Sequence, residues 1–273
     1  MFHLVSADWV EQRLDSPEFL FLDPRSPIRY MTSHLKNAVN LPVAKQRGAN
    51  GRLLPSDELA RRLGSVGLDT QHTPVLYDNS DGRNAALLAW ILAYLGRDDV
   101  HIMETFWETW VADKRDVFYR PVQPTPRAFT AHLRSEFRAS ADDVQKNRTA
   151  RLLDLRTPDE FSGHFEHDAR PGRIPGAANL PCDQIGVNGN ILRSPEQLDE
   201  LFASHGIVRD SQTIAYCRTG LRAALGFLAL TQLGRPVSLY DGSYSEWSAA
   251  GLPVENDLEK NERTNQKGES AHV

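Results

Sequence analysis

The chain contains two copies of one sequence pattern, and this repetition constrains its fold more than any other feature. Matching blocks occur in the same order in each half: LFLDPRSP and RLLDLRTP, HLKNAVNLP and RIPGAANLP, TPVLYD and QTIAYC, FWETW and YSEW. Asn40 and Asn179 are 139 positions apart, as are Tyr77 and Tyr216. Ordered repetition at a nearly fixed offset indicates a duplicated structural unit.

Each copy alternates between two kinds of apolar pattern. The short apolar runs FLFLD, PVLYD and VHIM, and LLDL, TIAYC and VSLYD in the second copy, are typical of buried strands. SDELARRLGSVG and SPEQLDELFASHG have helical spacing, with expected caps at Ser56 and Ser194 and ends at Gly67 and Gly206. Strands alternating with helices predict an α/β fold, with two tandem domains that each have a mainly parallel sheet flanked by helices.

The boundaries between these units follow from composition. We predict a first domain over residues 1–112 and a second over 129–255. The segment 113–128 contains three prolines and little periodicity, which indicates a linker. Residues 256–273 are polar throughout, so we predict a disordered tail.

Composition excludes several classes of function. A net charge of −5 argues against broad binding to nucleic acid or to anionic membranes. No apolar run reaches 18 residues, and the first residues lack the charge and apolar pattern of a secretory signal. Two cysteines, Cys182 and Cys217, cannot form a disulfide framework and suit a reducing compartment. We therefore expect a cytoplasmic protein.

Cys217 lies at a strand-to-helix junction that is typical of a reactive residue. It follows a predicted strand, at the sheet edge where ligands bind in open α/β folds, and precedes a helix. Gly220 permits unusual backbone conformations, so the N–H groups of a loop containing Arg218, Thr219 and Gly220 can point at one spot. These groups, the helix N-terminus and the charges of Arg218 and Arg222 favour a thiolate and bind anions. We predict that Cys217 is a nucleophile.

The alternative is a buried structural cysteine that merely ends a strand. In the first copy Asp78 occupies the matching position, so the fold itself does not need a cysteine there. An acidic residue also marks this position as polar, and we expect it to lie near solvent rather than in the core. The comparison between the copies therefore favours a functional Cys217.

Over residues 1–255 these motifs resemble the rhodanese superfamily, specifically the tandem-domain thiosulfate and 3-mercaptopyruvate sulfurtransferases. The motifs that carry the resemblance are Asp154-x-Arg156 with Glu160-Phe161, IPGAANLP at 174–181, CRTGLR at 217–222 and DGSYSEW at 241–247. The resemblance implies a catalytic second domain and a first domain that has lost its cysteine. It also implies an active site near the domain interface and a cysteine persulfide intermediate. Such a reaction needs no metal or organic cofactor.

The loop length separates two activities within this superfamily. Related phosphatases use Cys-x5-Arg, whereas Cys217 and Arg222 form Cys-x4-Arg, the sulfurtransferase form. Arg218 is typical of thiosulfate enzymes, and Thr219 is found in mercaptopyruvate enzymes. We predict transfer of sulfane sulfur from thiosulfate to cyanide or a thiol. The alternatives are a 3-mercaptopyruvate sulfurtransferase, or a persulfide carrier or binding module without turnover.

The predicted site residues have three roles. Cys217 is the nucleophile, and Asp154 and Arg156 form a buried pair that supports the site. The predicted substrate-binding residues are Arg218, Thr219, Gly220, Leu221, Arg222 and Arg173. The predicted partners are a small anionic sulfur donor and a thiol or protein acceptor, with no nucleic acid, membrane or metal.

Two positions leave alternatives open. The tandem enzymes commonly carry an arginine where this chain has Glu160, and Arg170 or Arg173 could substitute for it. Cys182 aligns with Val43 of the first copy, which favours packing over a role as a resolving thiol.

Overall fold

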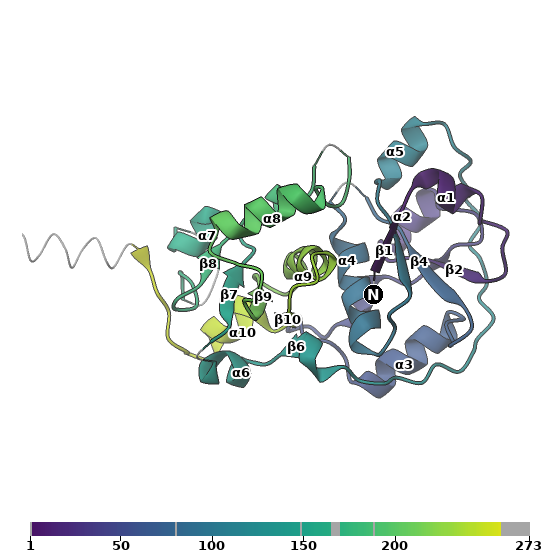
Figure 1. Ribbon diagram of the computed structural model, residues 1–273. Coiled ribbons are helices and arrows are strands. Elements are labelled where there is room, and N and C mark those ends of the chain that lie inside the picture. The colour runs from purple at the N-terminus through teal and green to yellow at the C-terminus, as the bar shows by residue number, and fades with distance from the viewer. Residues whose placement is uncertain (1, 80, 148, 165–169, 188, 258–273) are drawn as a thin grey trace, which may run out of the picture.

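The computed structural model describes residues 2–79, 81–147, 149–164, 170–187 and 189–257. It contains two domains, each built on a five-stranded parallel sheet (Figure 1). In the first domain the strand order is β1-β5-β4-β2-β3, and in the second it is β6-β10-β9-β7-β8. The two orders are equivalent, so the α/β fold and the duplication are confirmed.

The strands include all six of the predicted apolar runs, with bounds that differ by a residue or two. The strands of the first domain are β1 (Phe2–Val5), β2 (Phe19–Asp23), β3 (Val39–Asn40), β4 (Thr73–Leu76) and β5 (Val100–Met103). Those of the second domain are β6 (Arg138–Ala139), β7 (Arg151–Asp154), β8 (Ala178–Asn179), β9 (Thr213–Tyr216) and β10 (Val237–Tyr240).

Helices cover both faces of each sheet. The first domain has α1 (Ala7–Glu11), α2 (Pro27–Thr32), α3 (Ser56–Ser65), α4 (Arg83–Tyr94), α5 (Trp107–Ala112) and the 3-10 helix η1 (Val43–Gln46). The second has α6 (Ala141–Lys146), α7 (Pro158–Ser162), α8 (Pro195–Ser204), α9 (Ala223–Gln232), α10 (Ser243–Ala249) and the 3-10 helices η2 (Ser135–Phe137) and η3 (Cys182–Gln184). Among the described residues, no helix combines the length and apolar character needed to cross a membrane.

Only one of the two predicted serine caps is present. Ser194 caps α8 in a reciprocal capping box with Gln197. The prediction for α3 is wrong, because Pro55 occupies the N-cap position and Ser56 is already helical. A box at Ser56 would need an acceptor side chain three residues later, and Leu59 has none.

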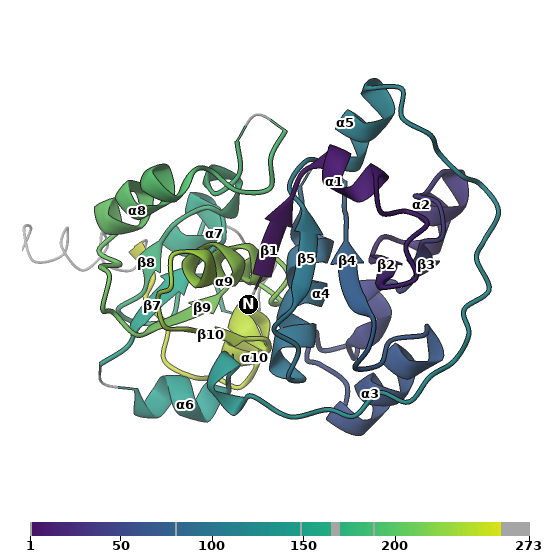
Figure 2. The same ribbon diagram turned by 45° about the vertical axis from the view of Figure 1, so that its right-hand side comes forward.

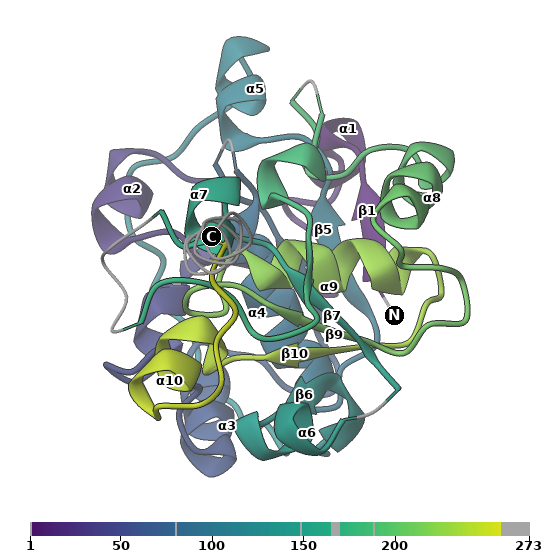
Figure 3. The same ribbon diagram turned by 90° about the vertical axis from the view of Figure 1, so that its left-hand side faces the viewer.

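The two domains meet through equivalent helices. α4 and α9 lie against each other between the two sheets (Figures 1 and 3). Each is buried along nearly its whole length, including Trp90 on α4 and Phe227 on α9. Side chains of both helices belong to one hydrophobic cluster. The interface between the domains is therefore a continuation of the protein core, and it holds the loops preceding α4 and α9 in fixed positions.

The linker packs on the first domain beyond the predicted end at residue 128. It passes α3 on the outside of the sheet (Figure 2), where the N–H of Arg127 donates to the carbonyl of Gly64. Further along, the N–H of His132 donates to the carbonyl of Leu95. Regular structure in the second half starts at η2.

The segment that follows each copy pairs with a residue shortly before the third strand of that copy's sheet, at equivalent positions in the two domains. His34 pairs with Phe118 after the first copy, and the aligned Arg173 pairs with Glu255 after the second. Asn256 also donates to the carbonyl of Pro171, so ordered chain continues past the predicted boundary at 255. The rest of the predicted tail, from residue 258, falls outside the described residues.

Candidate active site

A buried ion pair lies under the predicted site. Asp154 and Arg156 are fully buried, with a carboxylate oxygen 2.7 Å from the guanidinium Nη2. The Asn179 amide donates to the backbone carbonyls of both residues. Burial, together with the neighbouring Asp154, raises the pKa of Tyr216, the last residue of β9. The expected pair is thus present and lies beside the strand that leads to Cys217.

Cys217 follows β9 directly, at the carboxyl edge of the sheet. Its Sγ accepts the Gly220 N–H at 3.1 Å, and its own N–H donates to Ser243 Oγ at 3.2 Å. Gly220 has φ +87°, and a Cβ there would lie 3.0 Å from the carbonyl oxygen of Asp241. Glycine is needed on both counts, which agrees with the predicted special backbone of this loop.

The expectation that this position lies near solvent is wrong. Cys217 is 1% exposed and the matching Asp78 is 3% exposed. Asp78 is tolerated in the interior because its carboxylate accepts the backbone N–H groups of Asn79, Asn84 and Ala85. Burial raises the pKa of Asp78 to about 6, although these hydrogen bonds oppose the shift. In the first copy a side-chain carboxylate thus fills the backbone cradle.

Arg222 is engaged by an acidic partner. Its Nη1 and Nη2 lie 2.5 and 2.7 Å from the two carboxylate oxygens of Glu160. Glu160 also completes the capping box of α7 with Thr157. Although burial opposes its ionisation, hydrogen bonds from Arg222 and Thr157 hold the pKa of Glu160 below its ordinary value. Glu160 therefore compensates the charge of Arg222 and ties the end of the Cys217 loop to α7.

The other predicted cations differ in their surroundings. Arg173 contacts the carboxylates of Glu255 and Asp257, and Arg170 donates to the carbonyl of Leu252. These contacts direct both side chains to the end of the described chain and weigh against a role in substrate binding. Arg218 is half-buried within the loop, as are Thr219 and Leu221.

A cavity of about 330 Å³ lies between the domains beside this loop. Asp81, Arg83 and Phe106 line it from the first domain, and Cys182 and Leu225 from the second. Burial raises the pKa of Cys182, which also interacts electrostatically with Arg83, Arg222 and Cys217. Sequence reasoning missed this cavity, since its two walls come from segments about 100 positions apart.

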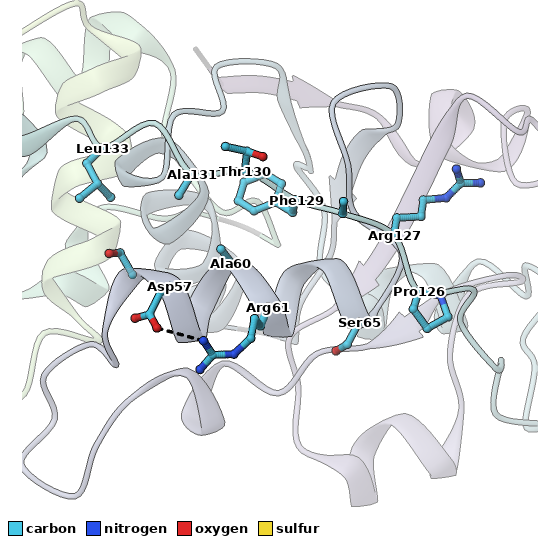
Figure 4. Close-up of a pocket in the computed structure, with 12 residues that line it drawn as sticks. Asp57, Ala60, Arg61, Ser65, Pro126, Arg127, Phe129, Thr130, Ala131 and Leu133 are labelled. Atoms are coloured by element: carbon cyan, nitrogen blue, oxygen red, sulfur yellow. Dashed lines mark hydrogen bonds and ion pairs between the residues drawn. The ribbon is translucent and has the colours of Figure 1, made fainter.

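A second cavity is remote from the chemistry. It has a volume of about 720 Å³ and lies between α3 and linker residues 126–133. Figure 4 shows Asp57 and Arg61 of α3 joined by an ion pair, with Phe129 of the linker lying across the helix from them. Its lining residues belong only to α3 and the linker, whereas the first cavity includes Cys182, which interacts electrostatically with Cys217, so we assign the second cavity no part in the site. Among the described residues, no group of three or more His, Cys, Asp and Glu side chains could hold a metal.

Comparison with known proteins gives relatives over nearly the whole chain. A family model described as a rhodanese-like domain matches residues 6–113 and 138–250. A protein of Haloferax volcanii named "Putative thiosulfate sulfurtransferase" is 34% identical over 92% of this chain and 96% of its own. "Sulfur carrier protein TtuD" of Thermus thermophilus is 30% identical over 92% of this chain and 95% of its own.

Solved structures share the fold. Wild-type EanB superposes with a TM-score of 0.83 at 24% identity, covering 93% of this chain and 69% of that one. An anaerobic ergothioneine biosynthesis enzyme from Chlorobium limicola gives a TM-score of 0.82 at 24% identity, covering 93% of this chain and 70% of that one. At this identity the likeness concerns the fold.

Proposed function

This chain belongs to the rhodanese-like domain family, and from that premise we propose that it is a sulfurtransferase that takes sulfane sulfur from thiosulfate. The acceptor is a thiophile such as cyanide or a thiol. The observation that carries the proposal is the hydrogen bond from the Gly220 N–H to Cys217 Sγ, at the amino end of the buried helix α9. A donor aimed at this sulfur favours its anionic form, which is the nucleophile.

The proposed reaction has two displacement steps. In the first, the Cys217 thiolate attacks the outer sulfur of thiosulfate, the S–S bond breaks, and sulfite leaves with the bonding electrons. This leaves a persulfide on Cys217. In the second step, cyanide attacks the terminal sulfur, and the Cys217 thiolate departs as thiocyanate forms. Every electron pair is accounted for, and no external oxidant or reductant is needed.

The loop residues have distinct proposed tasks. The Gly220 N–H stabilises negative charge on the sulfur, first as thiolate and then as persulfide. We assign Arg218, Thr219, Leu221 and Arg222 to the wall that receives the anionic donor. Arg222 does so through its fixed position, since Glu160 already balances its charge.

The cavity between the domains supports an approach for a small anion. It is lined by Cys182 of η3 and Leu225 of α9 on one side and by Arg83 on the other. A guanidinium beside a cavity attracts the sulfonate of thiosulfate or the carboxylate of 3-mercaptopyruvate. Asp81 and Asp183 also line the cavity, and Asp81 lies 3.7 Å from Arg83, so the charge of the cavity does not select a donor. We favour thiosulfate because Arg218 follows the cysteine.

A second candidate is a persulfide carrier that passes its sulfur to a protein partner. The name of the Thermus thermophilus relative, a sulfur carrier protein, favours it. Both candidates require a persulfide on Cys217, but they differ in turnover.

Steady-state kinetics test the proposed function. Thiocyanate release is measured with cyanide as acceptor and with thiosulfate or 3-mercaptopyruvate as donor. We expect a higher kcat/KM with thiosulfate. A higher kcat/KM with 3-mercaptopyruvate would reassign the donor, and one persulfide per chain without turnover would favour the carrier.

A further inference from the structure

A loop of the first domain forms part of the surroundings of Cys217. This loop, residues 47–53, is closed by pairing between Arg47 and Leu53. The N–H of Leu53 donates to the carboxylate of Asp241 at 2.8 Å, across the domain interface. A Cβ placed on Gly51 would lie 3.3 Å from Cβ of Thr219, so the loop packs directly on the segment that follows Cys217.

Arg47 has an unusual environment within this loop. Its Nε donates to the carbonyl of Gly51 at 2.6 Å, which fixes the guanidinium plane. Its Nη2 is shielded from solvent and has no hydrogen-bond partner in the described part of the chain. A Cβ placed on Gly220 would lie 3.6 Å from this nitrogen. The unpartnered end of the guanidinium thus lies next to the glycine whose N–H binds Cys217 Sγ.

A buried guanidinium nitrogen without a partner is costly and calls for an explanation. The carboxylate of Asp241, which interacts electrostatically with Arg47, is already bound by Arg138 and by the N–H of Leu53. Burial lowers the pKa of Arg47, while negative charge on Cys217 and on Asp241 acts in the opposite direction. Negative charge on Cys217 is therefore the natural counterpart of Arg47.

Two arginines of the second domain are less able than Arg47 to compensate a negative charge on Cys217, because each already has a carboxylate partner. Arg222 is compensated by both carboxylate oxygens of Glu160. Arg173 is engaged by Glu255 and Asp257 at the end of the described chain. Arg222 still interacts electrostatically with Cys217, but Glu160 offsets its charge, so a cation from the first domain adds to the counter-charge for the sulfur.

We propose that Arg47 is a positioning and charge-stabilising residue that the first domain contributes to the site on the second. It favours the Cys217 thiolate and steadies the persulfide anion that replaces it. The first domain has lost its own nucleophile at Asp78 but supplies a cation to the remaining one. The persulfide part of this inference rests on the proposed function, whereas the thiolate part does not.

Alkylation of Cys217 by iodoacetamide tests the proposal without a sulfur donor. The full chain is compared with Arg47→Met, which removes the charge, and with Arg47→Lys, which keeps it. Arg52→Met is the matched control, because Arg52 lies in the same loop and makes an ion pair with Glu246 across the domain interface. Peptide mass spectrometry separates labelling at Cys217 from labelling at Cys182.

A single nearby opposite charge changes the ionised fraction of a thiol by about tenfold or more. We expect Arg47→Met to alkylate about tenfold more slowly than the unmodified chain at pH 7. The two alkylation rates should converge as the pH is raised to 10. Arg47→Lys should recover most of the rate, and Arg52→Met should leave it unchanged. The other charged or titratable groups around the sulfur are Arg218, Arg222, Glu160, Cys182 and Asp241, and all remain in every variant.

Two results would overturn the proposal. One is an Arg47→Met rate equal to that of the unmodified chain at pH 7. The other is a loss that persists at pH 10 and is shared by Arg52→Met, because that pattern means damage to the loop rather than loss of charge. Failure of the proposed function has a different signature: thiosulfate leaves no persulfide, while the alkylation profile still reports on Arg47.

Discussion

The ion pair between Glu160 and Arg222 allows a quantitative test of how the Cys217 loop is held. The perturbation is a double-mutant cycle of Glu160→Gln, Arg222→Met and the double variant. The pair has two hydrogen bonds, of 2.5 and 2.7 Å. The side chain of Glu160 is 6% exposed and that of Arg222 is 18% exposed, so solvent screens the pair only weakly.

The expected coupling follows from this burial. Removing one partner of a fully buried pair costs roughly 3–5 kcal/mol, because the other charge is left unbalanced. Arg222 keeps some contact with solvent, and glutamine keeps a hydrogen-bond acceptor, so we expect a coupling of about 2 kcal/mol. A single variant that loses about 2 kcal/mol of stability through this coupling should have a Tm lower by about 4–8 °C in a chain of this size.

Urea unfolding measures the four free energies of unfolding in the cycle. The exposed pair of Asp142 and Lys146 on α6 serves as the matched control. Its side chains are 66% and 75% exposed, so its coupling should be about 0.5 kcal/mol or less. The reasoning is refuted if Glu160 and Arg222 couple no more strongly than this surface pair.

The remaining predictions concern pH, backbone and the first domain. Because the folded pKa of Glu160 lies below its ordinary 4.5, its contribution is complete above pH 4.5 and is lost as the pH falls through the lower folded pKa. The urea midpoints of the unmodified chain and Glu160→Gln should therefore approach each other as the pH falls below 4.5. Gly220→Ala should slow persulfide formation at least about tenfold in a mass-spectrometric time course, whereas Gly234→Ala, at φ +67° with open space around it, should not. Asp78→Ala should lower the free energy of unfolding by about 2 kcal/mol in urea, because three backbone N–H groups lose their acceptor. Equal persulfide rates for the two glycine variants, or an unchanged urea midpoint for Asp78→Ala, would contradict these accounts.

Local patterns were sufficient to predict the central strands, the duplication and the position of Cys217. Each of these depends on apolar runs and on residues adjacent in the sequence. The edge strands β1, β3, β6 and β8 escaped prediction for different reasons, and β3 and β8 have only two residues each. β6 has only two residues, Arg138 and Ala139, and β1 has four residues of which one is exposed, so neither shows a clear period.

Contacts between distant segments could not be predicted. The burial of Asp78 was missed although its partners are local, because an acidic side chain gives no sign that the backbone N–H groups of Asn79 and of the first turn of α4 will satisfy it. The pairing of Glu160 with Arg222 joins residues 62 positions apart, and Arg47 reaches the Cys217 loop only through the packing of one domain on the other. Glu160 offered one signal, since it stands where related enzymes carry a cation.

The same limit applies to Arg173. Like His34 in the first copy, Arg173 pairs with the chain that follows its own copy. Its partners Glu255 and Asp257 lie some 80 positions away, and only the fold shows that they occupy its guanidinium.

The formation of a persulfide on Cys217 is the most direct test of the whole account. The intact protein is incubated with thiosulfate, freed of excess donor and weighed by mass spectrometry, alongside Cys217→Ser. The account predicts a gain of one sulfur atom located at Cys217, its loss as thiocyanate on addition of cyanide, and no gain in Cys217→Ser. A sulfur retained by Cys217→Ser, or no gain in the unmodified chain, would contradict it.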